Sequence, residues 1–169
     1  MSAFWRGIYE NNQDHNEAAN WIPEVQEQIG NVPKMDDRII TDVEFQREIR
    51  RMKNFKSPGP DQITNFWLKN LTALHPMYLA AFNRILTGEE DAPPWLSEGL
   101  TTLLPKSAET HLPNKYRPIC CLPTTYKLLT AIISERIYRH LSQNELLSEQ
   151  QKGCIKNCLG TYQGPAATE

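Results

Sequence analysis

Hydrophobic residues recur at helical spacing along most of this chain, and the pattern is clearest after Thr41. Phe45, Ile49 and Met52 stand at positions i, i+4 and i+7, so they share one face of a helix expected over 41–54. Glu44 follows Thr41 by three residues, which is the spacing of a capping box at a helix start. Comparable spacing predicts further helices over 14–29, 63–71, 75–87 and 124–143.

Two of these helices have a predicted buried face. In the helix over 75–87, Pro76 suits the first turn, and Gly88 is expected to end the helix. Its inward-facing residues are expected to be Leu79, Phe82 and Leu86. The helix over 124–143 carries a wider apolar stripe, which consists of Tyr126, Leu128, Leu129, Ile132, Ile133, Ile137 and Leu141.

The segment KSPGPDQI, residues 56–63, separates the helices expected over 41–54 and 63–71. Its two prolines and the glycine between them cannot continue either helix, because proline lacks an N–H and glycine resists helical ordering. Asp61 is expected to cap the helix that follows. Local rules leave open whether this corner only turns the chain or shapes a surface for a ligand.

Two short extended runs, over 100–106 and 116–122, are joined by a segment rich in polar and turn-forming residues. This pattern predicts a β-hairpin with a long tip. Pro118 lies inside the second run and suits an edge strand, because it has no N–H to offer a neighbouring strand. The chain is therefore predicted to have an α+β, helix-dominated fold with one small β-hairpin.

The composition is that of an ordinary globular domain. The 169 residues are 40% hydrophobic and 22% charged, and this length suffices for one domain with a real core. The sequence has no apolar run near the roughly 20 residues that span a bilayer, and it does not begin with a secretory signal. The expected location is intracellular, in the cytoplasm and/or nucleus, with no membrane partner.

The cysteines do not predict a metal site. A neighbouring pair and a C-x-x-x-C pair differ from the C-x-x-C spacing typical of zinc ligands. His111 and His140 could complete a site in principle, but thiols without a ligand are favoured in a reducing compartment. We therefore predict no metal ligand among the four cysteines, which are Cys120, Cys121, Cys154 and Cys158.

Positive charge is concentrated locally, although the net charge is only −2. The first 99 residues carry 10 Lys or Arg against 15 Asp or Glu, whereas the remaining residues carry 8 against 5. A basic cluster directly precedes the corner and admits two interpretations, a solvated helix face or a contact for phosphates. The cluster consists of Arg47, Arg50, Arg51, Lys53 and Lys56.

Two further cations, Lys106 and Arg117, stand at the inner ends of the two predicted strands. They either are solvated or grip a polyphosphate from both sides of the hairpin tip, with lysine as a compact charge and arginine as a bidentate fork. The sequence contains no G-x-S-x-G, P-loop or H-E-x-x-H motif and no close carboxylate pair on a hairpin. We therefore predict no catalytic residue in this chain.

Five blocks follow one another in a specific order: SPGPD-x-I with a W-L-K helix, LLPK, N-x-YRPI-x-CLPT-x-YKLL, R-I-Y and EQ-x-KGC. Together they resemble the N-terminal part of the reverse transcriptases of non-LTR (LINE-type) retrotransposons. The resemblance covers roughly residues 40–161. It implies a fingers-type subdomain and early palm of a right-hand polymerase over 41–161. An N-terminal helical extension over 1–40 is expected before it, and the small, polar residues at the end of the sequence predict a disordered tail over 162–169.

The resemblance also implies roles for individual residues. The corner, with Ser57 and Gly59, resembles the first reverse-transcriptase motif, and the basic cluster would then contact template phosphates. Lys106 and Arg117 resemble the fingers residues that hold the triphosphate of the incoming nucleotide. Gln150, Lys152 and Gly153 resemble the approach to the first catalytic strand of the palm.

The sequence departs from the family after Thr161, where it becomes YQGPAATE instead of continuing to the metal-binding aspartates. The expectation is a fragment of an RNA-directed DNA polymerase that is inactive alone and binds no cofactor alone, although the full-length family enzyme uses Mg²⁺. The expected partners are RNA template, DNA primer, dNTP and the remaining palm and thumb. The alternatives are a catalytically dead nucleic-acid-binding module and a helical interaction module.

Overall fold

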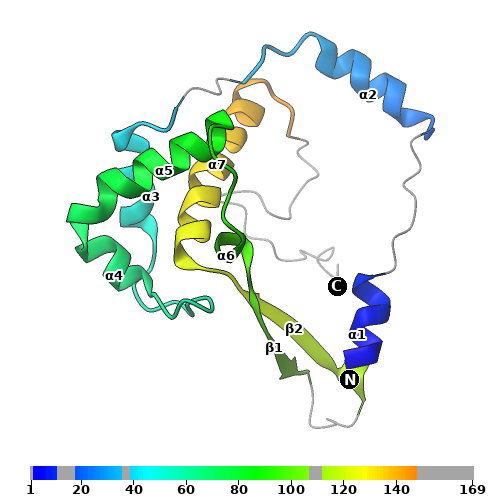
Figure 1. Ribbon diagram of the computed structural model, residues 1–169. Coiled ribbons are helices and arrows are strands. Elements are labelled where there is room, and N and C mark those ends of the chain that lie inside the picture. The colour runs from blue at the N-terminus through cyan, green and yellow to red at the C-terminus, as the bar shows by residue number, and fades with distance from the viewer. Residues whose placement is uncertain (1, 11–17, 36–38, 107–111, 148–169) are drawn as a thin grey trace, which may run out of the picture.

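The computed structural model describes residues 2–10, 18–35, 39–106 and 112–147 (Figure 1). These residues form a helix-dominated structure with one two-stranded antiparallel sheet, which confirms the predicted α+β class and the hairpin. The elements are α1 (Ser2–Tyr9), α2 (Trp21–Gly30), α3 (Asp42–Arg51), α4 (Asn65–Asn70), α5 (His75–Thr87), α6 (Pro94–Ser97), β1 (Leu100–Pro105), β2 (Tyr116–Cys121) and α7 (Thr124–Gln143), with 3-10 turns at Thr72–Leu74 and Pro113–Lys115.

The helices α3, α4, α5 and α7 gather into one group, and the hairpin projects away from them (Figure 1). Helix α2 stands apart from this group. It begins at Trp21, so the part of the predicted 14–29 helix before Trp21 is not confirmed, and residues 14–17 lie outside the described residues. Helix α1 was not predicted, and none of its residues is buried.

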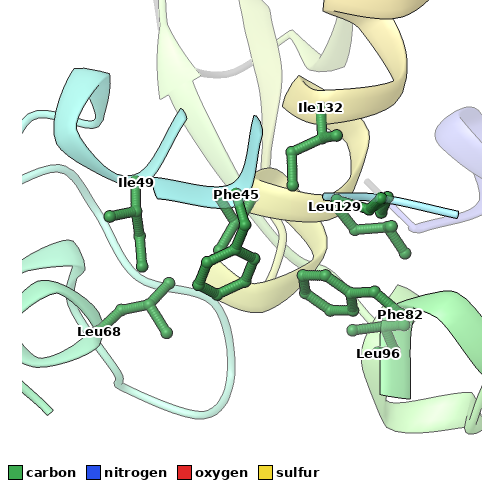
Figure 2. Close-up of a cluster of buried hydrophobic side chains, with 9 residues drawn as sticks. Phe45, Ile49, Leu68, Phe82, Leu96, Leu129 and Ile132 are labelled. Carbon is green, nitrogen blue, oxygen red and sulfur yellow. The ribbon is translucent and has the colours of Figure 1, made fainter. Parts of the chain in front are cut away.

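The core lies between α3 and the first turns of α7. Thr41 and Glu44 form the predicted capping box, because each side chain accepts a hydrogen bond from the other residue's backbone N–H. Figure 2 shows Phe45 at the centre of the core, with Leu68 and Phe82 on its two sides. The buried cluster is made of Ile40, Phe45, Ile49, Leu68, Phe82, Leu96, Leu128, Leu129 and Ile132.

Two predicted faces are wrong in detail. Leu86 of α5 is exposed, and Ile85, three residues after Phe82, packs against the core instead. On α7, Ile137 is also exposed. Periodicity identified both helices, but it could not tell which part of each apolar stripe a neighbour covers.

The corner between α3 and α4 is held by its own turn. Gln62 N–H donates to the carbonyl of Gly59 at 3.1 Å, and Gln62 has a φ of 57°. Asp61 does not cap α4, which begins at Asn65 after Thr64. Instead, Oδ1 of Asp61 accepts a hydrogen bond from Ile63 N–H at 3.2 Å, which is the local bond that an aspartate makes in a turn.

The corner packs directly onto the start of α7. Gly59 is buried, and a Cβ at this position would overlap the backbone nitrogen of Pro123. Thr124 Oγ1 donates to the carbonyl of Ile63 at 2.5 Å, and Lys127 Nζ donates to the carbonyl of Ser57 at 2.8 Å. Only glycine therefore permits this approach of two backbones.

An ion pair joins the start of α3 to the middle of α7. Arg136 Nε donates to Glu44 Oε1 at 2.9 Å, and Arg136 Nη2 donates to Glu44 Oε2 at 2.8 Å. This bidentate contact, with smaller contributions from the Thr41 backbone and hydroxyl, lowers the pKa of Glu44 from 4.5 to about 2. Glu44 therefore serves the helix cap and the packing of α3 on α7 at the same time.

We predict that Gly59→Ala lowers the free energy of unfolding by about 1–3 kcal/mol, because the new Cβ would overlap the Pro123 backbone. Gly30→Ala is the matched control, since a Cβ at Gly30 meets nothing within 4 Å. Urea unfolding followed by circular dichroism measures both changes. Equal midpoints for the Gly59→Ala variant and the parent would contradict the close approach.

We also predict a pH dependence from Glu44. Because the pKa of Glu44 is lowered in the folded state, its contribution to stability is full above pH 4.5 and is lost as the pH falls toward about 2. Urea unfolding at several pH values should show Glu44→Gln less stable than the parent at pH 6, with the difference shrinking below pH 4.5. Glu98→Gln, a change on an exposed residue, should show no such trend. A constant difference for Glu44→Gln would count against the assigned ion pair.

Candidate nucleic-acid interface

The structure divides the predicted basic cluster into two groups. Arg47 Nε and Arg51 Nη1 both donate to Glu48 Oε1, at 3.0 and 2.9 Å, and the Glu48 residue is only 6% exposed. Arg51 also donates to Glu135 Oε2 of α7 at 3.1 Å. Arg47 and Arg51 therefore compensate carboxylates at the interface of α3 and α7, since a buried charge needs a partner.

The other three predicted cations, Arg50, Lys53 and Lys56, are exposed, and no ion pair joins their side chains to any described residue. Two lysines that the sequence did not single out lie beside them. Lys69 Nζ donates to the carbonyl of Arg50 at 3.1 Å, and Lys127 Nζ contacts the carbonyl of Ser57. We call this set the corner cations: Arg50, Lys53, Lys56, Lys69 and Lys127.

Ser57 and Gly59 occupy different positions in the corner. Ser57 is exposed, and its carbonyl is occupied by Lys127. Gly59 is buried against Pro123, so packing alone accounts for a glycine at this position. Their predicted contact with a template strand stays a prediction.

Lys106 and Arg117 lie close to each other at the outer end of the hairpin. Arg117 pairs with Leu104 across the strands, and Lys106 N–H donates to the carbonyl of Lys115 at 2.7 Å, which continues the pairing. The two-residue period of a strand therefore places both cations on the same face of the hairpin. Lys106 Nζ donates to the Asn114 carbonyl at 3.0 Å, and Arg117 is exposed.

The two groups of cations lie apart. In Figure 1 the outer end of the hairpin points away from α3 and α4, so the fold does not bring Lys106 and Arg117 to the corner cations. The described residues thus offer two separate groups of cations. Residues 107–111 of the hairpin tip lie outside the described residues.

Within the described ranges, no group of three or more His, Cys, Asp or Glu residues could hold a metal ion. Cys120 and Cys121 are free thiols. No helix in the part of the chain that the structure describes is long and apolar enough to cross a membrane. Cys154, Cys158, Gln150, Lys152, Gly153 and the predicted tail over 162–169 lie outside the described residues.

Comparison with known proteins gives two similar proteins. The chain is 29% identical over 136 residues to a probable RNA-directed DNA polymerase from transposon X-element of Drosophila melanogaster. The aligned region covers 78% of this chain and 15% of that protein. It is 28% identical over 111 residues to a probable RNA-directed DNA polymerase from transposon BS of the same species. This second aligned region covers 65% of this chain and 12% of that protein. No protein-family profile matches the chain. Most of this chain is therefore similar to a small part of two transposon polymerases.

Proposed function

We propose that this chain is the fingers and early palm region of an RNA-directed DNA polymerase of a non-LTR retrotransposon. The observation that carries the proposal is the similarity to two transposon polymerases, which extends over 78% and 65% of the chain. The two groups of cations support it, because a polymerase must hold both the phosphates of a template and the triphosphate of a nucleotide. In this proposal, residues 41–161 form the polymerase region and 1–40 form an extension before it.

The corner cations would contact the template. Single-stranded RNA presents one phosphate at each nucleotide, and exposed lysine and arginine side chains bind such phosphates without selecting a sequence. Arg50, Lys53 and Lys56 suit this role better than Arg47 and Arg51, whose guanidinium groups already contact the buried Glu48. The corner packs on α7 through Gly59, and this contact fixes its place beside the start of that helix.

The hairpin cations would contact the incoming nucleotide. Arg117 can offer two parallel N–H donors to a phosphate, and Lys106 can add a compact charge on the same face of the hairpin. The described residues do not supply a carboxylate set for Mg²⁺, so no catalytic step is assigned to them. In a whole polymerase, the catalytic carboxylates, the metal, the primer contacts and the remaining palm and thumb would come from other residues.

The template role predicts a change in the salt dependence of RNA binding. Replacing Arg50, Lys53 and Lys56 together with Gln should weaken binding to all single-stranded RNA sequences alike. The slope of log affinity against log salt should fall by up to about 2, at roughly 0.7 for each phosphate that the variant no longer neutralises. Fluorescence anisotropy with labelled oligonucleotides, starting at low salt, measures both quantities.

The matched control is the triple variant Arg6→Gln, Lys34→Gln and Arg139→Gln. It removes the same charge from exposed positions outside the corner and should keep most of the slope. Equal salt slopes for the parent and the corner variant would contradict the proposed contact of Arg50, Lys53 and Lys56 with template phosphates. A different outcome would favour the alternative, a nucleic-acid-binding module without polymerase activity. In that outcome RNA binding follows the prediction, but no assembly that contains this chain shows polymerase activity.

The nucleotide role predicts a change in KM. We consider a chimaera in which this chain replaces the matching region of the X-element polymerase, with the chain alone as an inactive blank. Arg117→Ala and Lys106→Ala should each raise the KM for dNTP roughly ten- to a hundredfold, because each removes a charge-assisted bond to a phosphate. Arg139→Ala, an exposed cation on α7, is the control. An unchanged KM in both hairpin variants would contradict the triphosphate contact.

A further inference from the structure

An exposed aromatic side chain directly precedes the corner in the chain. Phe55 is 83% exposed, although burial of a phenylalanine is normally favourable. Its ring stacks on Phe66, with centroids 5.9 Å apart and an interplanar angle of 13°. The outer face of Phe55 is therefore open, while its inner face is supported by another ring.

A second open ring lies beside this pair. Trp67 is 54% exposed, and it meets Phe66 edge to face at a centroid distance of 5.5 Å and an angle of 81°. Phe66 thus joins Phe55 and Trp67 into one aromatic cluster. The three rings come from two segments, the chain after α3 and the first turn of α4.

Backbone contacts hold these two segments together. The buried side chain of Asn65 donates from Nδ2 to the carbonyl of Lys53 at 2.6 Å. Phe66 N–H donates to the carbonyl of Asn54 at 3.2 Å. The two residues before Phe55 are consequently held against α4 by these hydrogen bonds. The position of Phe55 beside Phe66 and Trp67 therefore follows from the backbone structure.

Three of the corner cations are close in the chain to the aromatic cluster. Lys53 and Lys56 flank Phe55 in the chain, and Lys69 follows Trp67 by two residues. Lys69 Nζ donates to the Arg50 carbonyl, so helix α4 contacts the end of α3. Open aromatic rings among cations match single-stranded nucleic acid, whose bases stack on rings and whose phosphates bind lysine. A duplex keeps its bases stacked inside and would leave the rings without partners.

We infer that Phe55 and Trp67 form a base-stacking surface for single-stranded nucleic acid, whose phosphates contact Lys53, Lys56 and Lys69. The inference rests on the proposed template contact, and it adds a contribution to the affinity that does not depend on charge. Stacking accepts every base, because each base has a π face, so binding is expected to be tolerant of sequence. It also gives the corner a preference for single strands over duplexes, which phosphate contacts alone do not provide.

The test compares Phe55→Leu and Trp67→Leu with the parent, because leucine keeps an apolar side chain and removes the π face. The affinity for a labelled single-stranded RNA of about 12 nucleotides should fall about 5- to 150-fold for each base that is deprived of its ring. The salt slope should stay equal to that of the parent, since the cations that bind phosphates are unchanged. Trp95→Leu, a change at a comparably exposed tryptophan on α6, should leave affinity unchanged.

Two further measurements keep the test decisive. An abasic oligomer with the same number of phosphates should bind the parent no more tightly than RNA binds either leucine variant. Phe55→Tyr keeps the ring and should bind RNA as tightly as the parent, whereas a tyrosine variant as weak as Phe55→Leu would contradict a role for the π face.

Failure of the inference and failure of the proposed function give different results. Parent protein that binds RNA with a salt slope, but binds the abasic oligomer equally well and is unaffected by both leucine changes, would overturn the stacking surface alone. The aromatic cluster would then be a contact for another part of a protein. Parent protein that binds no single strand even at low salt would overturn the stacking surface together with the template contact.

Discussion

The contact of the corner with the first turn of α7 is the constraint on which the rest of the described structure depends. Gly59 lies against the backbone of Pro123, and the Thr124 hydroxyl and Lys127 ammonium bind carbonyls of the corner. Because β2 ends at Cys121 and α7 begins at Thr124, this contact also fixes where the hairpin leaves the helices. A single close approach of two backbones therefore sets the relative positions of both groups of cations.

Ion pairing with carboxylates decides which cations remain available to a ligand. Arg47 and Arg51 contact Glu48, and Arg136 contacts Glu44, so these three arginines compensate carboxylates within the fold. Arg50 and Lys53, only a few residues away, remain exposed. A chain with a net charge of −2 can thus hold a local positive surface, because much of its negative charge lies elsewhere or is already compensated.

Local signals in the sequence predicted local structure, and tertiary contacts account for the differences. The capping box at Thr41, the end of α5 at Gly88, where φ is 73°, and the strand pairing around Pro118 follow from short-range backbone rules and are confirmed. The exposure of Leu86 and Ile137 depends on which neighbour covers each helix, and periodicity alone does not contain that information. In the candidate site, the basic residues could be identified from the sequence, but their division into paired and open side chains could not. The corner lysines Lys69 and Lys127 and the open rings of Phe55 and Trp67 emerge only when α4 and α7 meet the corner.

The ion pair between Glu44 and Arg136 has a consequence for synthesis of the chain, because its partners are 92 residues apart. At the usual speed of translation, roughly 5–18 s pass between the addition of Glu44 and that of Arg136. During this interval α3 cannot pack against α7. The apolar side chains of Phe45 and Ile49 therefore stay partly exposed to water and to chaperones. Among the described elements, α7 is therefore the last to be synthesised and the last that can close the core.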